Sequence, residues 1–167
     1  IYISLAVSSA VDVLIVFLPL FGTENNFSPF AVGVILAIRA GASMFSRIFL
    51  GAIALKLGSH FLMVSSIVAS TVFCAAMFFA RSPISLGIAV GIAGLALGVG
   101  QPLTMSLVSR LAPPQDRALA ISARLTANRV GQFVVPASAG AVAGAAGAGS
   151  VFLGLAALLA TSIFTAL

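Results

Sequence analysis

The sequence predicts an all-α membrane protein, a polytopic bundle of six transmembrane helices. Hydrophobic residues make up 61% of the 167 positions and charged residues only 7%, and the mean hydropathy is +1.25. Soluble domains are usually about 45 to 50% apolar and about 25% charged. The apolar residues also gather into six runs, each close to the roughly 20 residues that a helix needs to cross a bilayer.

The six runs cover residues 1–21, 29–55, 61–80, 84–108, 118–143 and 150–167. Backbone polar groups cannot stay unpaired in lipid and strand-type alternation is absent, so each run is predicted to be a helix. The separators contain turn residues such as Gly58 and Pro83, and none is long enough for a soluble domain. We expect one six-helix bundle, and a fragment of a longer protein because both ends lie within apolar runs.

The basic residues are scattered rather than clustered. The net charge is +5 without a basic run, which argues against a nucleic-acid partner and for charged membrane loops. Lys56 lies in the second separator, and Arg110 and Arg117 lie in the fourth. Short loops rich in Lys and Arg face the cytoplasm, so these two separators and both ends are predicted to be cytoplasmic, in a plasma or inner cell membrane.

Residues for covalent or metal chemistry are scarce. The only histidine, His60, lies in a separator, and Cys74 is the only cysteine. A Ser-His pair at membrane depth and a cluster of metal ligands are therefore both excluded. We expect no enzymatic activity, no catalytic residue, no metal and no cofactor.

The first run has a polar stripe, with Ser4, Ser8 and Asp12 at intervals of four residues on one helix face. An ionised side chain in hydrocarbon costs about 2.5 to 3.5 kcal/mol on insertion scales, so it normally faces a bundle interior or a wet cavity. Asp12 is expected to bind a proton, bind a cationic group or neutralise an arginine. A structural ion pair without turnover is the alternative.

The second run has its polar residues on one face too, because Ser43, Ser46 and Arg47 follow Arg39 at i+4, i+7 and i+8. At about 1.5 Å per residue, Arg39 falls near the middle of a roughly 30 Å hydrocarbon layer. Arg47 is closer to the cytoplasmic end, where we expect its side chain to extend to the interface.

The fifth run is the most polar of the six. Arg124, Asn128 and Gln132 follow one another at intervals of four, and Arg129 lies beside them near mid-span. Arg124 is within reach of the cytoplasmic interface, whereas Arg129 is expected to need an interior partner or water.

The fourth run combines glycines with Gln101, Pro102 and Thr104. Such an interruption is typical of a helix that bends around a binding cavity, and it also fits a helix that is merely kinked. The glycines of the fourth and fifth runs are expected to allow close helix packing.

Two loops resemble those of a known family. Gly51, Lys56 and Gly58 match the pattern Gly-x-x-x-Asp-Arg-x-Gly-Arg-Arg, although Leu55 replaces the acid and Ser59 and His60 replace the basic pair. The stretch from Pro113 to Arg117 is similar to a Pro-x-x-x-Arg-Gly loop, with Ala in place of the final Gly. In this order and spacing, the chain resembles helices seven to twelve of the major facilitator superfamily, one half of a twelve-helix transporter bundle.

The resemblance implies secondary active transport of a small solute by alternating access, with a coupling ion and with the missing N-terminal half of the same chain as partner. It assigns Asp12, Gln101 and Thr104 to a central cavity, for substrate contact or proton coupling. It assigns another four residues to the cavity edge or the interface between halves: Arg39, Arg124, Asn128 and Arg129. A channel or permease subunit of another polytopic family is the alternative.

Overall fold

The computed structural model describes residues 2–164, which form six α-helices and one short 3-10 helix. The helices are α1 (Tyr2–Glu24), α2 (Pro29–Leu57), α3 (Ser59–Phe78), α4 (Pro83–Leu111), α5 (Arg117–Ala146) and α6 (Ala148–Phe164), with η1 (Pro114–Asp116) before α5. No strand occurs among these residues, so the predicted all-α class is confirmed. The predicted helix ends at Ile1 and Leu167 lie outside the described residues.

Local sequence signals determine where the helices begin and end. Ser28 precedes α2, and its hydroxyl oxygen accepts a hydrogen bond from the Ala31 amide at 3.2 Å. Ser82 caps α4 in the same way and forms a reciprocal capping box with Ser85. Each cap is followed by a proline, whose missing N–H costs nothing in the first helical turn. At the other end, Gly58 terminates α2 with a φ of 81°, a backbone conformation that favours glycine.

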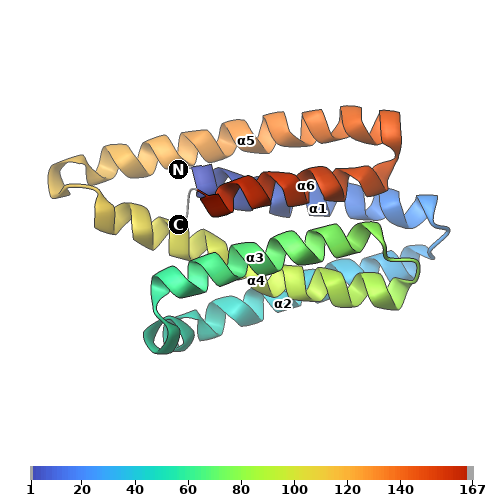
Figure 1. Ribbon diagram of the computed structural model, residues 1–167, viewed down its shortest axis with the longest axis horizontal. Coiled ribbons are helices and arrows are strands. Elements are labelled where there is room, and N and C mark those ends of the chain that lie inside the picture. The colour runs from blue at the N-terminus through green and yellow to red at the C-terminus, as the bar shows by residue number, and fades with distance from the viewer. Residues whose placement is uncertain (1, 165–167) are drawn as a thin grey trace.

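The helices run up and down between two ends of the bundle. The α2–α3 and α4–α5 connections lie at one end, and the other three connections lie at the opposite end (Figure 1). α2 packs chiefly on α4, and α1 packs on α5. Both pairs are parallel, as the colour gradient in Figure 1 shows.

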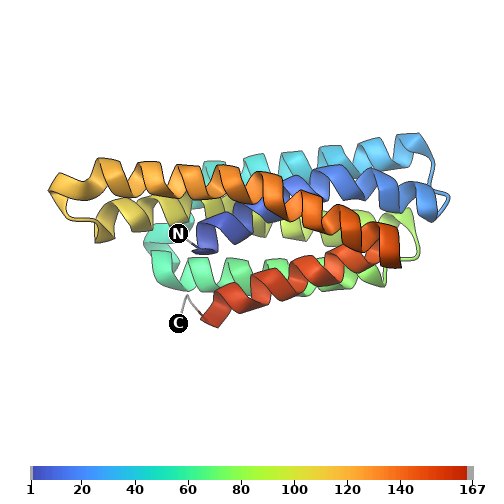
Figure 2. The same cartoon turned by 90° about the horizontal axis from the view of Figure 1, so that it is seen from above.

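The chain consists of two three-helix units, α1 to α3 and α4 to α6, and the third helix of each unit closes the bundle. α3 packs on α4 and α6 packs on α1, while α3 and α6 also contact each other. In Figure 2 these two helices lie along one side and α2 lies along the other. Exchanging α1 with α4, α2 with α5 and α3 with α6 therefore preserves the main pairings, as expected of two inverted three-helix repeats.

Length and composition indicate which helices can cross a membrane. α1, α2, α3 and α4 are each long and apolar enough, and α6 is apolar but shorter, with 17 residues in the described range. α5 has 30 residues but carries Arg117, Arg124 and Arg129, which lower its hydropathy. Prolines lie inside α1, α4 and α5 without ending any of them.

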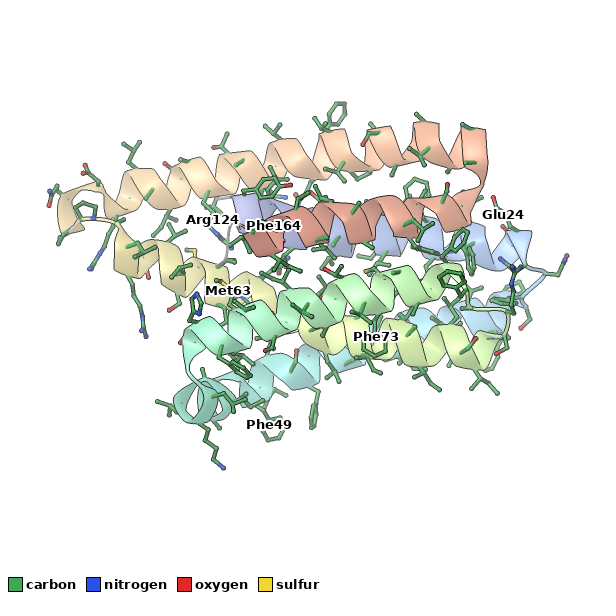
Figure 3. The ribbon with its side chains drawn as sticks, viewed as in Figure 1. Glu24, Phe49, Met63, Phe73, Arg124 and Phe164 are labelled. Carbon is green, nitrogen blue, oxygen red and sulfur yellow. The ribbon has the colours of Figure 1, made fainter. Side chains whose placement is uncertain are left out.

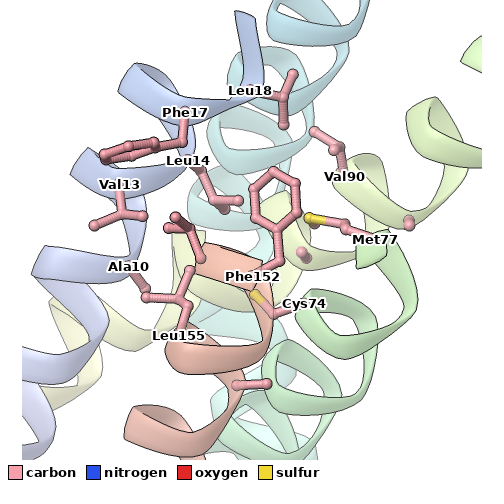
Figure 4. Packing of buried hydrophobic residues seen from close by; sticks show 14 of the residues in the cluster. Ala10, Val13, Leu14, Phe17, Leu18, Cys74, Met77, Val90, Phe152 and Leu155 are labelled. Atoms are coloured by element: carbon pink, nitrogen blue, oxygen red, sulfur yellow. The ribbon is translucent and has the colours of Figure 1, made fainter. Parts of the chain in front are cut away.

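An apolar core joins α1, α3, α4 and α6, and side chains of α2 and α5 pack against it. Phe152 of α6 is fully buried at its centre, between Leu14 and Leu18 of α1 and Met77 of α3 (Figure 4). Phe152 and Phe21 meet edge to face, with ring centroids 5.2 Å apart. This core fixes α1 and α4 in place, and their other faces are left to line a polar cavity.

Candidate functional site

A cavity of about 450 Å³ lies between α1, α2, α4 and α5. The cavity takes no lining residue from α3 or α6. Its lining residues are Ser8, Arg47, Leu50, Gln101, Pro102, Arg124, Leu125, Asn128, Arg129 and Gln132. The volume is in the range of small-molecule sites, about 300 to 1,000 Å³.

The wall between α1 and α5 is built by two polar stripes that meet. Because the helices are parallel and both stripes recur every four residues, their side chains come together in register. The Ser4 hydroxyl donates to Asn128 Oδ1 at 3.1 Å, or accepts from Asn128 Nδ2 at 3.0 Å. Gly131 permits the approach, since a Cβ atom there would lie 2.7 Å from Leu5 Cγ and 2.9 Å from Ser9 Oγ.

The wall between α2 and α4 depends on Gly98. A Cβ atom at this position would lie 2.8 Å from both the Cα and the carbonyl oxygen of Ser43, and it would also collide with the Ser46 hydroxyl. This close approach brings Arg47 alongside α4. Its Nε donates to the Gly98 carbonyl at 3.3 Å and its Nη2 donates to Gln101 Oε1 at 3.1 Å.

Arg124 is buried at the end of the cavity nearest the α4–α5 connection, with 5% of its surface exposed. Figure 3 shows it between α5 and the yellow part of α4. Its Nη2 donates to Thr104 Oγ1 at 2.9 Å and to the Gln101 carbonyl at 3.2 Å, and its Nη1 lies 3.3 Å from the Met105 sulfur. Its Nε is buried without an acceptor.

The two mid-span arginines of α5 lie in different environments. Arg129, expected to need an interior partner or water, is exposed and donates to Gln132 Oε1 at 3.0 Å on its own helix. Arg124, expected within reach of the interface, is the buried one. The reason is the helical period: Arg124, Asn128 and Gly131 share the face that packs on α1 and α4, and Arg129 lies on the adjacent face.

Asp12 lies beside the cavity rather than in its lining. The Gln132 side chain, Arg129 and Arg39 all act on its carboxylate electrostatically. Neither arginine comes within the 4.0 Å of an ion pair. Asp12 Oδ2 and Arg39 Nε are both buried without a hydrogen-bond partner. Gln132 thus links Asp12 to Arg129 and to the cavity.

The remaining predicted positions fall in separate places. Gly51 and Lys56 are exposed on the last turns of α2, and Gly58 ends that helix, away from the cavity lining. No group of three His, Cys, Asp or Glu side chains that could hold a metal occurs between residues 2 and 164.

Six lining residues were missing from the predicted site, among them the polar residues Ser8, Arg47 and Gln132. Arg47 was expected to extend to the interface, yet it turns toward Gln101. Gln132 was noted only as part of a stripe, yet it contacts both Arg129 and Asp12. The shared face of Arg39 and Arg47 was the signal available for Arg47. The sequence contained no signal for the contact of Arg47 with α4, because it does not show which helix faces pack against each other.

Comparison with known proteins identifies the family. The sequence profile of the Major Facilitator Superfamily matches residues 1–167. The chain belongs to this superfamily. The resemblance seen in its loops is thereby confirmed at the level of the family, and the chain is a multi-pass membrane protein of a transporter family, not of an enzyme family.

One curated relative is the "Multi-drug resistance efflux pump PmrA homolog" of Lactococcus lactis subsp. lactis (strain IL1403). It is 29% identical to this chain over 122 residues, which is 73% of this chain and 30% of the relative. The match thus spans less than a third of the relative's length.

Proposed function

We propose that this chain is the C-terminal half, helices seven to twelve, of a secondary active transporter that exports a small solute by alternating access. The α2–α3 and α4–α5 connections carry the loop residues that resemble this half of the family, and the efflux relative favours export. Lys56 and Arg117 lie at the end that we assign to the cytoplasm, in a plasma or inner cell membrane, which puts both ends of the chain on that side too.

The polar cavity is the observation that carries the proposal. In the bilayer its arginines and amides need water, substrate or protein on their open side. The N-terminal half of the same chain is the partner that would close it, with α2 and α5 at the edges of the contact. Phe45 of α2 and Phe133 of α5 present exposed aromatic rings for contact with that half or with lipid.

Ion coupling is assigned to Asp12, with a proton as the ion to test first. The carboxylate lies in the membrane and reaches the cavity through the Gln132 amide and Arg129. Protonation would remove the charge on which Arg39, Arg129 and Gln132 act. Substrate contact is assigned to Gln101, which lines the cavity, and to Thr104, whose hydroxyl oxygen accepts a hydrogen bond from Arg124. The edge of the cavity is assigned to Arg39, Arg124, Asn128 and Arg129.

The test is transport by the complete protein in proteoliposomes with an imposed proton gradient. Asp12→Asn should abolish gradient-driven accumulation of the solute and leave expression intact. Asp116→Asn is the matched control, because Asp116 is exposed in the α4–α5 connection. Unchanged transport with unchanged pH dependence in Asp12→Asn would disprove the coupling role.

The pairing of Asp12 with Arg39 is tested separately. Reversing both charges should restore more transport than either single reversal leaves, because the two groups interact electrostatically without a fixed ion pair. Strict additivity of the two single effects in the double-mutant cycle would show that they act independently.

The half-transporter assignment has its own test. The complete reading frame should encode six further apolar helices before this chain, and preloaded solute should stimulate uptake of labelled solute by counterflow. A channel or permease subunit of another family would instead show flux without counterflow.

A further inference from the structure

We propose that the cavity between α1, α2, α4 and α5 binds an anionic group of the transported solute, a carboxylate, phosphate or sulfonate. This proposal names the substrate class of the site and rests on the proposed transport function. The observation behind it is the juxtaposition of three guanidinium groups around one cavity without a carboxylate in its lining.

The charges of the cavity do not balance. Arg47, Arg124 and Arg129 line it, and arginine stays protonated in proteins. Glu24 belongs to the opposite end of α1, and Asp116 to the α4–α5 connection. Among the acidic side chains of residues 2–164, Asp12 is the one beside the cavity, and it interacts with Gln132 as well as with Arg129 and Arg39. Uncompensated positive charge at membrane depth is costly, so a negative group that enters the cavity gains attraction from all three arginines.

The arginines are held in place by neutral acceptors. The Gly98 carbonyl and Gln101 Oε1 hold Arg47, Thr104 and the Gln101 carbonyl hold Arg124, and Gln132 holds Arg129. Such contacts orient a guanidinium without cancelling its charge. Each guanidinium has five N–H donors, and these contacts use only part of them.

Arg124 offers the most developed binding group. Only 5% of its surface is exposed, it lines the cavity, and its Nε has no hydrogen-bond acceptor. Asn128, also buried, adds an amide to the same wall. Arginine binds carboxylate, phosphate and sulfonate oxygens through paired N–H donors, so a planar or tetrahedral oxyanion matches this arrangement and a cationic solute does not.

The experiment compares two dyes on one xanthene framework, anionic fluorescein and a cationic rhodamine methyl ester. Binding to the complete protein in lipid nanodiscs is followed by fluorescence anisotropy at neutral pH. Fluorescein should bind at least tenfold more tightly than the rhodamine ester. Competition by benzoate, inorganic phosphate and benzenesulfonate then identifies the oxyanion that the site prefers.

Variants connect the binding to the arginines. Arg129→Gln should weaken fluorescein binding about tenfold and leave rhodamine binding within twofold, and Arg129→Lys should fall between Gln and the parent. Arg124→Gln should weaken fluorescein binding further. If the buried Arg124 is needed for folding, the exposed Arg129→Gln variant still tests the role of the arginines. Arg117→Gln is the control, because Arg117 is exposed and outside the cavity.

Three results would overturn the proposal: fluorescein binding too weak to detect, tighter binding of the rhodamine ester, or equal loss of both dyes in Arg129→Gln. The last would mean that Arg129 affects binding through the shape of the site and not through its charge. Gradient-driven efflux of the rhodamine ester in any of these cases would leave the proposed transport function standing, and loss of all solute counterflow would disprove that function separately.

Discussion

The apolar core around Phe152 and the polar cavity wall both include α1, but they are stabilised by different interactions. One face of α1 presents Leu14 and Leu18 to α6, and the other presents Ser4 and Ser8 to α5. The core depends on shape and dispersion. The wall depends on hydrogen bonds between helices and on glycines that let backbones approach.

The difference matters because lipid is as apolar as the core. Helices in a bilayer gain little from burying hydrocarbon, and their association depends on packing and on polar contacts. In the core, the loss of unfolding free energy should therefore depend on the size of the cavity that a substitution leaves. In the wall, it should depend on which hydrogen-bond partner or close helix contact the substitution removes. Four variants of the complete protein, compared by reversible unfolding in mixed micelles, test this contrast.

Phe152→Ala should cause the largest loss. Removing a fully buried ring at the junction of α1, α3 and α6 leaves a cavity that the neighbours fill only in part. The free energy of unfolding should fall by about 3 kcal/mol, with little change in transport per folded molecule. Phe133→Ala is the matched control, because this ring is 78% exposed. Equal losses in the two variants would remove the distinction between core and surface.

Gly98→Ala should cost about 2 kcal/mol, since the new methyl group meets the backbone of Ser43 rather than a movable side chain. It should also separate Arg47 from Gln101 and weaken fluorescein binding. Gly140→Ala has no atom within 4 Å of the new methyl group and should be tolerated. A stable Gly98→Ala protein with normal binding would show that the wall does not need this close approach.

Ser4→Ala tests the hydrogen bond between α1 and α5. Asn128 loses its partner, and the free energy of unfolding should fall by about 0.6 kcal/mol, the average for such bonds in membranes. The double-mutant cycle with Asn128→Ala should show coupling of that size. Ser138→Ala serves as control because that hydroxyl donates to Val135 of its own helix.

Glu24→Gln should have the smallest effect. Both carboxylate oxygens accept from the Ala148 amide, at 3.1 and 3.0 Å, at the N-terminus of α6. Glutamine keeps an acceptor but loses the charge that favours a helix N-terminus, so we expect a loss of about 0.5 kcal/mol at low ionic strength. Because Glu24 is exposed, this difference in unfolding free energy should shrink as salt is added. A difference that does not change with salt would indicate that the substitution disturbed the hydrogen-bond geometry rather than the charge.

Much of the candidate site was visible in the residues themselves. The four-residue spacing of Ser4, Ser8 and Asp12 and of Arg124, Asn128 and Gln132 predicted two polar helix faces, and both lie at or beside the cavity. The roles of Arg39 and Asp12 stay predictions. Burial was harder to predict from the sequence. Arg124 and Arg129 are only five positions apart, and the packing of α5 on α1 and α4 determines which of the two side chains is buried.

The membrane class, the six helices and the family could all be inferred from the amino-acid sequence alone. These depend on local composition, period and turn chemistry, which neighbouring residues decide together. Three features could be seen only in the folded chain: Arg47 turns to Gln101, Gln132 interacts with both Asp12 and Arg129, and the arginines face a cavity without an acid in its lining. These depend on which helix faces meet, and residues far apart in the chain determine that through packing.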